Sequence, residues 1–269
     1  MSETSPQAAC ARHPETPARA APCARCGDFL CERCFSHEEE RTCLRCVQRT
    51  GADRIAWERP GRGLARRFAQ TSLALAFSPA ESATEIARGG RLGSAVLYLL
   101  GVALAAGLAH GVLAIAVFVA FGLFDDPLFY GLALLGALVQ LPIAWALGLG
   151  AMGGLAACAY HLSARVLGGV GSFESSARAV LYQSGLSLWL VPASILGVVP
   201  VLGLLANAAA ILMLLFISLL SLHVVARQAH ALSSTRAWLA ASAATAVIAG
   251  IGALAVAGAF LLLATLRPV

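Results

Sequence analysis

The sequence contains no lysine, and all 19 of its basic residues are arginines. This absence excludes the phosphate-binding lysine of P-loop nucleotidases, the kinase lysine, Schiff-base lysines and Ser–Lys catalytic pairs. Exclusive use of arginine is also typical of a high-GC genome, which favours a bacterial source.

Charge is scarce as well, at 12% of residues, or about half the usual fraction. From Leu92 onward the chain carries only five arginines and three acidic residues. With 59% hydrophobic residues and a mean hydropathy of +0.78, it is too apolar for a soluble globular protein. We therefore expect an integral membrane protein. The first 60 residues show no apolar segment of the secretory-signal type, and we attribute the net charge of +5 to membrane topology rather than to a nucleic-acid partner.

Cysteine, by contrast, is concentrated at one end of the sequence. Seven of the eight cysteines and one histidine form four pairs, each with two residues between its members: Cys10 and His13, Cys23 and Cys26, Cys31 and Cys34, and Cys43 and Cys46. Soft ligands at this spacing favour zinc, and eight of them fill two tetrahedral sites. The alternative, a set of disulfides, needs an oxidising compartment.

The composition of these sites predicts a structural rather than a catalytic role, because protein ligands take every coordination position. A module of this size buries little apolar surface, so metal binding would supply its folding free energy. Arginine stands third in every pair, as Arg12, Arg25, Arg33 and Arg45. These guanidinium groups either offset the negative charge of the thiolates or reflect the arginine-rich composition.

The order of the four pairs resembles the B-box zinc finger. In that family the first and third pairs bind one metal, and the second and fourth bind the other. The resemblance therefore implies one site of Cys10, His13, Cys31 and Cys34, and a second site of Cys23, Cys26, Cys43 and Cys46. The last pair departs from the family pattern, because B-boxes usually carry histidines there. His37 is either a further candidate ligand or a solvated loop residue.

Between the zinc module and the apolar region, residues 47–63 are polar and arginine-rich, and we predict a linker. Apolar positions then recur at helical spacing, at Leu64, Phe68, Thr71 and Leu75. This helix lies either on the anionic inner leaflet or against the membrane domain. A capping box at 78–81 and the stop at Gly89 and Gly90 predict a second short helix from Pro79 to Arg88.

Long apolar stretches predict about five transmembrane helices, because each needs about 20 apolar residues to cross the hydrocarbon core. They are Leu92 to Leu123, Leu128 to Leu162, two spans within Ala179 to Ala226 divided near Pro192 to Pro200, and Trp238 to Leu266. The third of these spans carries the polar Gln183, Ser184 and Ser187. It could therefore be re-entrant, which would make the count even.

Loop charges predict the orientation of these spans. Arginines precede the first span and occupy alternate loops, at Arg88, Arg91, Arg165, Arg178, Arg227 and Arg236. Of the arginines beside the spans, only Arg267 would face outward. The opposite loops, residues 125–130 and 198–203, contain none. Because arginine is retained on the cytoplasmic side, we predict a multi-pass protein of the bacterial inner membrane with a cytoplasmic N-terminus.

The predicted spans contain no lysine, arginine, aspartate or glutamate, whereas ion-coupled transporters commonly carry such residues. His110 is expected near the midplane of the bilayer. It either binds a ligand or relays protons, or it forms a hydrogen bond with a neighbouring backbone carbonyl. We favour the hydrogen bond. Two pairs of glycines have a spacing that lets helices pack closely: Gly107 with Gly111, and Gly150 with Gly154. The same pairs offer faces for a homo-oligomer. Cys158, in an apolar run, is predicted to be a small buried residue.

Several positions of the apolar region resemble the Yip domain, a five-span family named for eukaryotic members that interact with Rab-type GTPases. They are Phe77-Ser78-Pro79, Tyr182-Gln183, Pro192, Gly197, Pro200, Gly203, His223, Ala229-His230-Ala231-Leu232-Ser233 and Arg236-Ala237. The resemblance covers residues 64–269 and implies a non-enzymatic protein linked to membrane organisation or trafficking. The Asp-Leu-Tyr-Gly-Pro motif of the eukaryotic members is missing, so Rab binding is not implied.

Two other function classes stay open. An intramembrane serine protease needs a serine beside backbone donors and a histidine on another helix, and the nearest match, Gly185-Leu186-Ser187-Leu188, lacks the glycine that normally follows the serine. A transporter or channel is disfavoured by the absence of intramembrane carboxylates.

The sequence thus predicts an all-α polytopic membrane helix bundle with a small cross-braced zinc-binding module before it. Residues 1–50 form the module with two structural zinc ions, residues 51–91 an arginine-rich linker with interfacial helices, and residues 92–269 the transmembrane domain. The expected function is non-enzymatic, with the lipid bilayer and a cytosolic protein as partners and no nucleic acid.

Overall fold

The computed structural model describes residues 10, 11, 13, 15–17, 29, 31–34, 55–59, 61, 63–120, 122, 127–196 and 200–265. The chain divides into two compact units. The smaller unit comprises residues 1–54 and 58–62, and the larger one residues 55–57 and 63–269.

The larger unit is built from helices throughout its described part. They are α2 (Leu64–Phe77), α3 (Pro79–Ala87), α4 (Leu92–Ala120), α5 (Pro127–Leu135), α6 (Leu141–Val166), α7 (Phe173–Gln183), α8 (Leu190–Ile195), α9 (Pro200–Ala229) and α10 (Ser234–Thr265). A π-helical turn, η3 (Gly136–Gln140), joins α5 to α6, and a 3-10 segment, η4 (Ser184–Trp189), joins α7 to α8. The all-helical class predicted for this region is confirmed.

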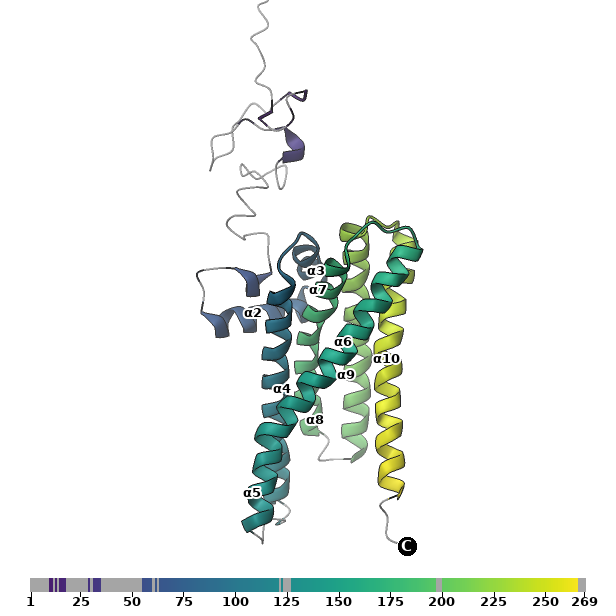
Figure 1. The fold of residues 1–269 in the computed structure, drawn as a ribbon. Coiled ribbons are helices and arrows are strands. Elements are labelled where there is room, and N and C mark those ends of the chain that lie inside the picture. Colours follow the sequence, from purple (N-terminus) through teal and green to yellow (C-terminus); the bar gives the residue numbers. More distant parts are fainter. Residues whose placement is uncertain are drawn as a thin grey trace, which may run out of the picture. The chain divides into compact units, whose positions relative to one another are not determined.

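Length and composition qualify three of the described helices to cross a membrane: Leu92–Ala120, Tyr130–Val166 and Leu202–Ala229. The 32-residue helix α10 runs lengthwise beside them, and the α7–η4–α8 segment packs among them (Figure 1). The third predicted span is therefore an interrupted helix rather than a continuous one. The count of five spans stays a prediction.

The interruption at η4 coincides with a close approach to α4. A Cβ atom at Gly185 would collide with the hydroxyl of Tyr98 and lie 3.1 Å from Leu75 Cδ1. Only a residue without a side chain lets the segment settle against that tyrosine. The same tyrosine hydroxyl shares a 2.7 Å hydrogen bond with Ser72 of α2, so η4, α4 and α2 meet at one point.

Glycine also brings α4 against the start of α6. A Cβ atom on Gly107 would lie 2.6 Å from Pro142 N, and one on Gly111 would collide with Ala137 O. The prediction that this pair is a packing device is confirmed. Gly150 and Gly154 have open space around them instead, so this pair makes no close contact with the part of the chain that the structure describes.

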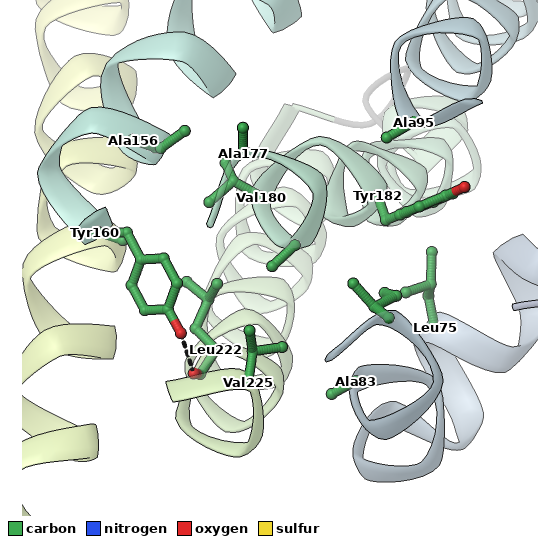
Figure 2. Packing of buried hydrophobic residues seen from close by; sticks show 14 of the residues in the cluster. Leu75, Ala83, Ala95, Ala156, Tyr160, Ala177, Val180, Tyr182, Leu222 and Val225 are labelled. Carbon is green, nitrogen blue, oxygen red and sulfur yellow. Dashed lines mark hydrogen bonds between the residues drawn. The ribbon is translucent and has the colours of Figure 1, made fainter. Parts of the chain in front are cut away.

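The core of the larger unit is centred on three fully buried tyrosines, Tyr98, Tyr160 and Tyr182. Tyr160 of α6 donates a hydrogen bond of 2.8 Å to the backbone oxygen of Leu222 in α9 (Figure 2). Small side chains surround these rings and let the helices approach one another. Cys158, predicted to be buried, is exposed on α6, and this prediction is wrong because α6 is apolar on its outward face as well.

The linker prediction is wrong at residues 55–57, which belong to the larger unit and are buried. The indole N–H of Trp57 donates to Ser94 O at 2.8 Å, and its backbone N–H donates to Thr71 Oγ1 at 2.8 Å. The guanidinium group of Arg67 donates a hydrogen bond of 3.1 Å to Trp57 O. Three residues of an otherwise polar segment thus anchor the chain to α2 and α4.

Helix α2 packs against the bundle through Thr71, Ser72 and Leu75, which are buried. This confirms the packed alternative for one face, while Leu64 and Leu73 stay exposed on the other. The following helix, α3, begins at Pro79 as predicted and ends before two glycines with φ of +127° and +150°.

The predicted capping box is wrong, because the side chain of Ser78 makes no capping hydrogen bond. A serine caps α7 instead: Ser172 Oγ accepts a hydrogen bond of 3.2 Å from the backbone N–H of Ser175. Both serines precede a helix, and the difference lies in the backbone at the cap, which is extended at Ser172 and not at Ser78.

Candidate metal centre

Four potential ligands converge in the smaller unit: Cys10, His13, Cys31 and Cys34. Their ligand atoms all lie within 4.8 Å of one another. The two pairs are 21 residues apart along the chain, and they are the first and the third of the four pairs. This is the grouping that the B-box resemblance implies for one of its two sites.

The separations between these atoms match a tetrahedral zinc site. Zinc bonds of about 2.3 Å to sulfur and 2.0–2.1 Å to nitrogen place tetrahedral ligands about 3.8 Å apart for two sulfurs and about 3.6 Å apart for sulfur and nitrogen. Cys34 Sγ lies 3.9 Å from Cys10 Sγ and 3.9 Å from Cys31 Sγ. His13 Nδ1 lies 3.4 Å from Cys31 Sγ and 3.5 Å from Cys34 Sγ. Cys10 Sγ lies 3.9 Å from His13 Nδ1, so the separations as a group suit one tetrahedral cation.

The same distances decide against the disulfide alternative for this cluster. A disulfide needs its two sulfurs about 2.05 Å apart, whereas Cys34 Sγ lies 3.9 Å from the sulfurs of both Cys10 and Cys31. None of these three cysteines forms a disulfide.

Backbone hydrogen bonds shape both halves of the cluster. In the first pair, Cys10 N donates to Thr16 O at 3.0 Å and Thr16 N donates to His13 O at 2.8 Å. In the third pair, Cys34 N donates to Cys31 O at 2.9 Å within the short 3-10 helix η1 (Glu32–Cys34). A bond of 2.9 Å from Ala11 N to Phe29 O links the two halves.

Burial makes the cluster a poor place for free thiols and a good one for a cation. Cys10, Cys31 and Cys34 are 2%, 2% and 5% exposed, while His13 is partly exposed. Burial, together with the neighbouring thiols of Cys31 and Cys10, raises the pKa of Cys34 to about 12 in the metal-free protein. A bound divalent cation would lower the pKa of the thiol instead, because it stabilises the thiolate and so releases the proton.

The second set of predicted ligands lies outside the described residues. This holds for Cys23, Cys26, Cys43 and Cys46, and also for the spare candidate His37. Among the described residues, the structure thus brings together one group of four that could hold a metal ion. The identity and the number of bound metals stay predictions.

In the larger unit, His110 has the local partners expected of a structural histidine. Its Nδ1 lies 2.9 Å from Ala106 O, one turn earlier in α4, and its Nε2 lies 3.2 Å from Ser194 Oγ of α8. The ring stacks on Trp145 at a centroid distance of 5.1 Å. The predicted bond to a neighbouring backbone carbonyl is confirmed.

Ser187, the nearest match to a protease nucleophile, makes a local contact too. Its hydroxyl donates a hydrogen bond of 2.6 Å to Ser184 O within η4. Back-bonding of this kind is common for serine in helical segments.

Sequence reasoning missed a buried polar network between α6, α7 and the end of α9. Ser176 Oγ lies 3.0 Å from His230 Nε2 and 3.2 Å from His161 Nδ1. His230 is fully buried, and burial, with His161 and Arg165 nearby, lowers its pKa to about 4. These residues are far apart along the chain, so no spacing pattern could group them.

Arg178, counted as a loop charge, is buried as well, at 2% exposure. Its guanidinium group donates to Ile86 O at 3.0 Å and to Gly89 O at 2.6 Å. It therefore caps the carbonyl end of α3, a favourable place for a cation.

No family model, curated protein or solved structure matches this chain. The likeness to B-box fingers and to the Yip domain consequently rests on the quoted residues alone.

Proposed function

We propose that this chain is a non-enzymatic, multi-pass protein of the bacterial inner membrane whose zinc module recruits a cytosolic protein to a helical scaffold. The observation that carries the proposal is the group of Cys10, His13, Cys31 and Cys34, whose ligand atoms lie within 4.8 Å of one another. Four protein ligands saturate a tetrahedral ion, so no position is open for a substrate or an activated water.

The donor set favours zinc over other cations. Three thiolates and one imidazole suit a soft or borderline metal in tetrahedral geometry, whereas calcium and magnesium prefer oxygen ligands. The ion would link residues 10–13 to residues 31–34 and so hold the smaller unit together. A second zinc on Cys23, Cys26, Cys43 and Cys46 follows from the B-box resemblance.

A five-span topology with a cytoplasmic N-terminus completes the proposal. Helices α4, α6 and α9 have the length and composition to cross a membrane, and α10 and the interrupted α7–η4–α8 segment run beside them. The loop arginines support the orientation. A reporter that is active only outside the cytoplasm, fused after Val269, should be active, and activity of a cytoplasmic reporter there instead would reject the odd count.

Recruitment is favoured over transport because the one histidine near a midplane is engaged by Ala106 and Ser194. A transporter that used His110 would have to break these two contacts for the ring to act on a moving solute. Solute flux into reconstituted vesicles that is abolished by His110→Ala would favour transport.

The test of recruitment is chemical crosslinking in native membranes with matched cysteine variants. Cys31→Ser removes a ligand, whereas Cys158→Ser changes an exposed cysteine that is not a ligand. We expect a cytosolic partner to crosslink with the native chain and with Cys158→Ser, and to be lost with Cys31→Ser. Identical partner lists for all three proteins would reject recruitment by this module.

A further inference from the structure

The larger unit contains a cavity of about 770 Å³. Ligand pockets for small molecules span roughly 300–1,000 Å³, so the cavity is large enough for one. Its wall is mostly apolar and is formed by α4, α6, α7, η4, α8, α9 and α10. On α9 and α10 the lining lies near the middle of the helix, between Ile211 and Ser218 and between Ile248 and Ala253.

One part of this wall is polar. Gln183 ends α7, is 7% exposed and lines the cavity. Its carboxamide oxygen has no hydrogen-bond partner among the described residues, and the hydroxyl oxygen of Ser184, the next residue, has none either. Ser187 and Ser218 also line the cavity.

The unpaired carboxamide of Gln183 in the cavity wall would be stabilised by a hydrogen bond to a ligand. A buried amide without a hydrogen bond destabilises the fold, and the hydrocarbon core offers no water to pair with it. The oxygen and nitrogen of a glutamine side chain are interchangeable by rotation, so Gln183 can accept from a ligand or donate to it.

The described lining residues also limit the charge of the ligand. None of them is an arginine, an aspartate, a glutamate or a histidine. A charged headgroup would therefore be buried without a partner, which is strongly unfavourable in a membrane. An uncharged polar group fits the site, and the apolar remainder fits a hydrocarbon chain.

We propose that this cavity binds an uncharged single-chain lipid, with a hydroxyl headgroup bonded to the carboxamide of Gln183 and its chain lying between α9 and α10. The site is separate from the zinc module, and its occupancy does not depend on recruitment.

The probe is a long-chain fatty alcohol that carries a diazirine in its chain, added to the full-length protein in lipid nanodiscs. After irradiation we expect labelled peptides from α9 and α10 within the cavity lining. An unlabelled long-chain alcohol should compete at about tenfold lower concentration than the alkane of equal length, because only the alcohol satisfies the carboxamide. The corresponding fatty acid, as its carboxylate, should compete no better than the alkane.

Matched variants locate the polar contact. Gln183→Leu should raise the alcohol concentration needed for competition about tenfold and leave the alkane unchanged. Gln140→Leu, the same change at an exposed position in η3, should alter neither. Ala249→Phe, which fills the cavity from an accessible wall position, should abolish labelling by the probe, and helix content measured by circular dichroism confirms folding for each variant.

Three results would overturn the proposal. Equal competition by alcohol and alkane in the native protein would leave no role for Gln183. Stronger competition by the fatty acid would show a charged ligand. Labels found only at outward-facing positions such as Leu204, and unaffected by Ala249→Phe, would show bulk lipid at the surface.

Discussion

Among the described residues of the smaller unit, the buried side chains are those of Cys10, Cys31 and Cys34, whereas the larger unit buries three tyrosines and an extensive set of small apolar residues. In the first unit, a metal bound to these ligands would supply the folding free energy that apolar burial supplies in soluble domains. In the second, helices are held by close packing at Gly107 and Gly111 and by hydrogen bonds from buried polar groups. One chain therefore contains two units that should fail under different treatments.

The largest difference between the two units is expected on removal of the metal. Apparent binding free energies of structural zinc reach about 10–16 kcal/mol, so chelation or Cys34→Ser should unfold the smaller unit. We expect rapid proteolysis of the N-terminal region, measured by mass spectrometry, with the helix content of the bundle unchanged. Cys158→Ser serves as the control and should keep native resistance. Joint loss of both units would contradict their independence.

The converse experiment damages the bundle and spares the metal centre. Gly107→Ala places a Cβ atom 2.6 Å from Pro142 N, and overpacking of this kind costs about 1–3 kcal/mol. Gly150→Ala, at a position with open space, should be neutral or slightly stabilising. Denaturant unfolding in detergent micelles measures both changes. Equal stability of the two variants would refute the packing role of Gly107.

Acid should also weaken the bundle through His230. Its folded-state pKa is lowered to about 4, against about 6.5 in the unfolded chain. The unfolded state therefore binds the proton first as the pH falls, and the stability contribution present above pH 6.5 is lost between about pH 6.5 and pH 4. His230→Gln should reduce this pH dependence, and an unchanged profile would assign it to other groups.

The smallest expected effect is a stabilisation. Ala231, just after α9, is the one described residue other than glycine with a positive φ, at 55°. A left-handed conformation costs a residue with a Cβ about 1–2 kcal/mol, so Ala231→Gly should raise the free energy of unfolding by up to about 1 kcal/mol. The neighbouring change Ala229→Gly, inside the helix, should lower it. Destabilisation by Ala231→Gly would show that the backbone is not strained there.

The two regions also differ in how far the sequence predicted them. Ligand spacing is a local pattern, and the resemblance to a known finger grouped Cys10 and His13 with the third pair. In the apolar region, Pro79 and the two glycines marked the limits of α3 because they act on the local backbone. Helices that are apolar on every side show no periodicity to separate inward from outward faces. For that reason the exposure of Cys158 was not predictable.

Other features arise only from tertiary contacts. The 3-10 segment at η4 depends on Gly185 meeting Tyr98, and the burial of Arg178 depends on the carbonyl end of α3. Trp57 was missed because its apolar stretch is three residues long, although Ile55-Ala56-Trp57 stands out within an arginine-rich segment.

In the proposed metal centre, protein ligands saturate a structural zinc ion. X-ray absorption at the zinc edge of the full-length protein tests this directly. We predict a first shell of sulfur at about 2.3 Å and nitrogen at 2.0–2.1 Å, without oxygen, and a loss of bound zinc in Cys31→Ser but not in Cys158→Ser. A water oxygen in the first shell, or a full zinc content in Cys31→Ser, would contradict the account.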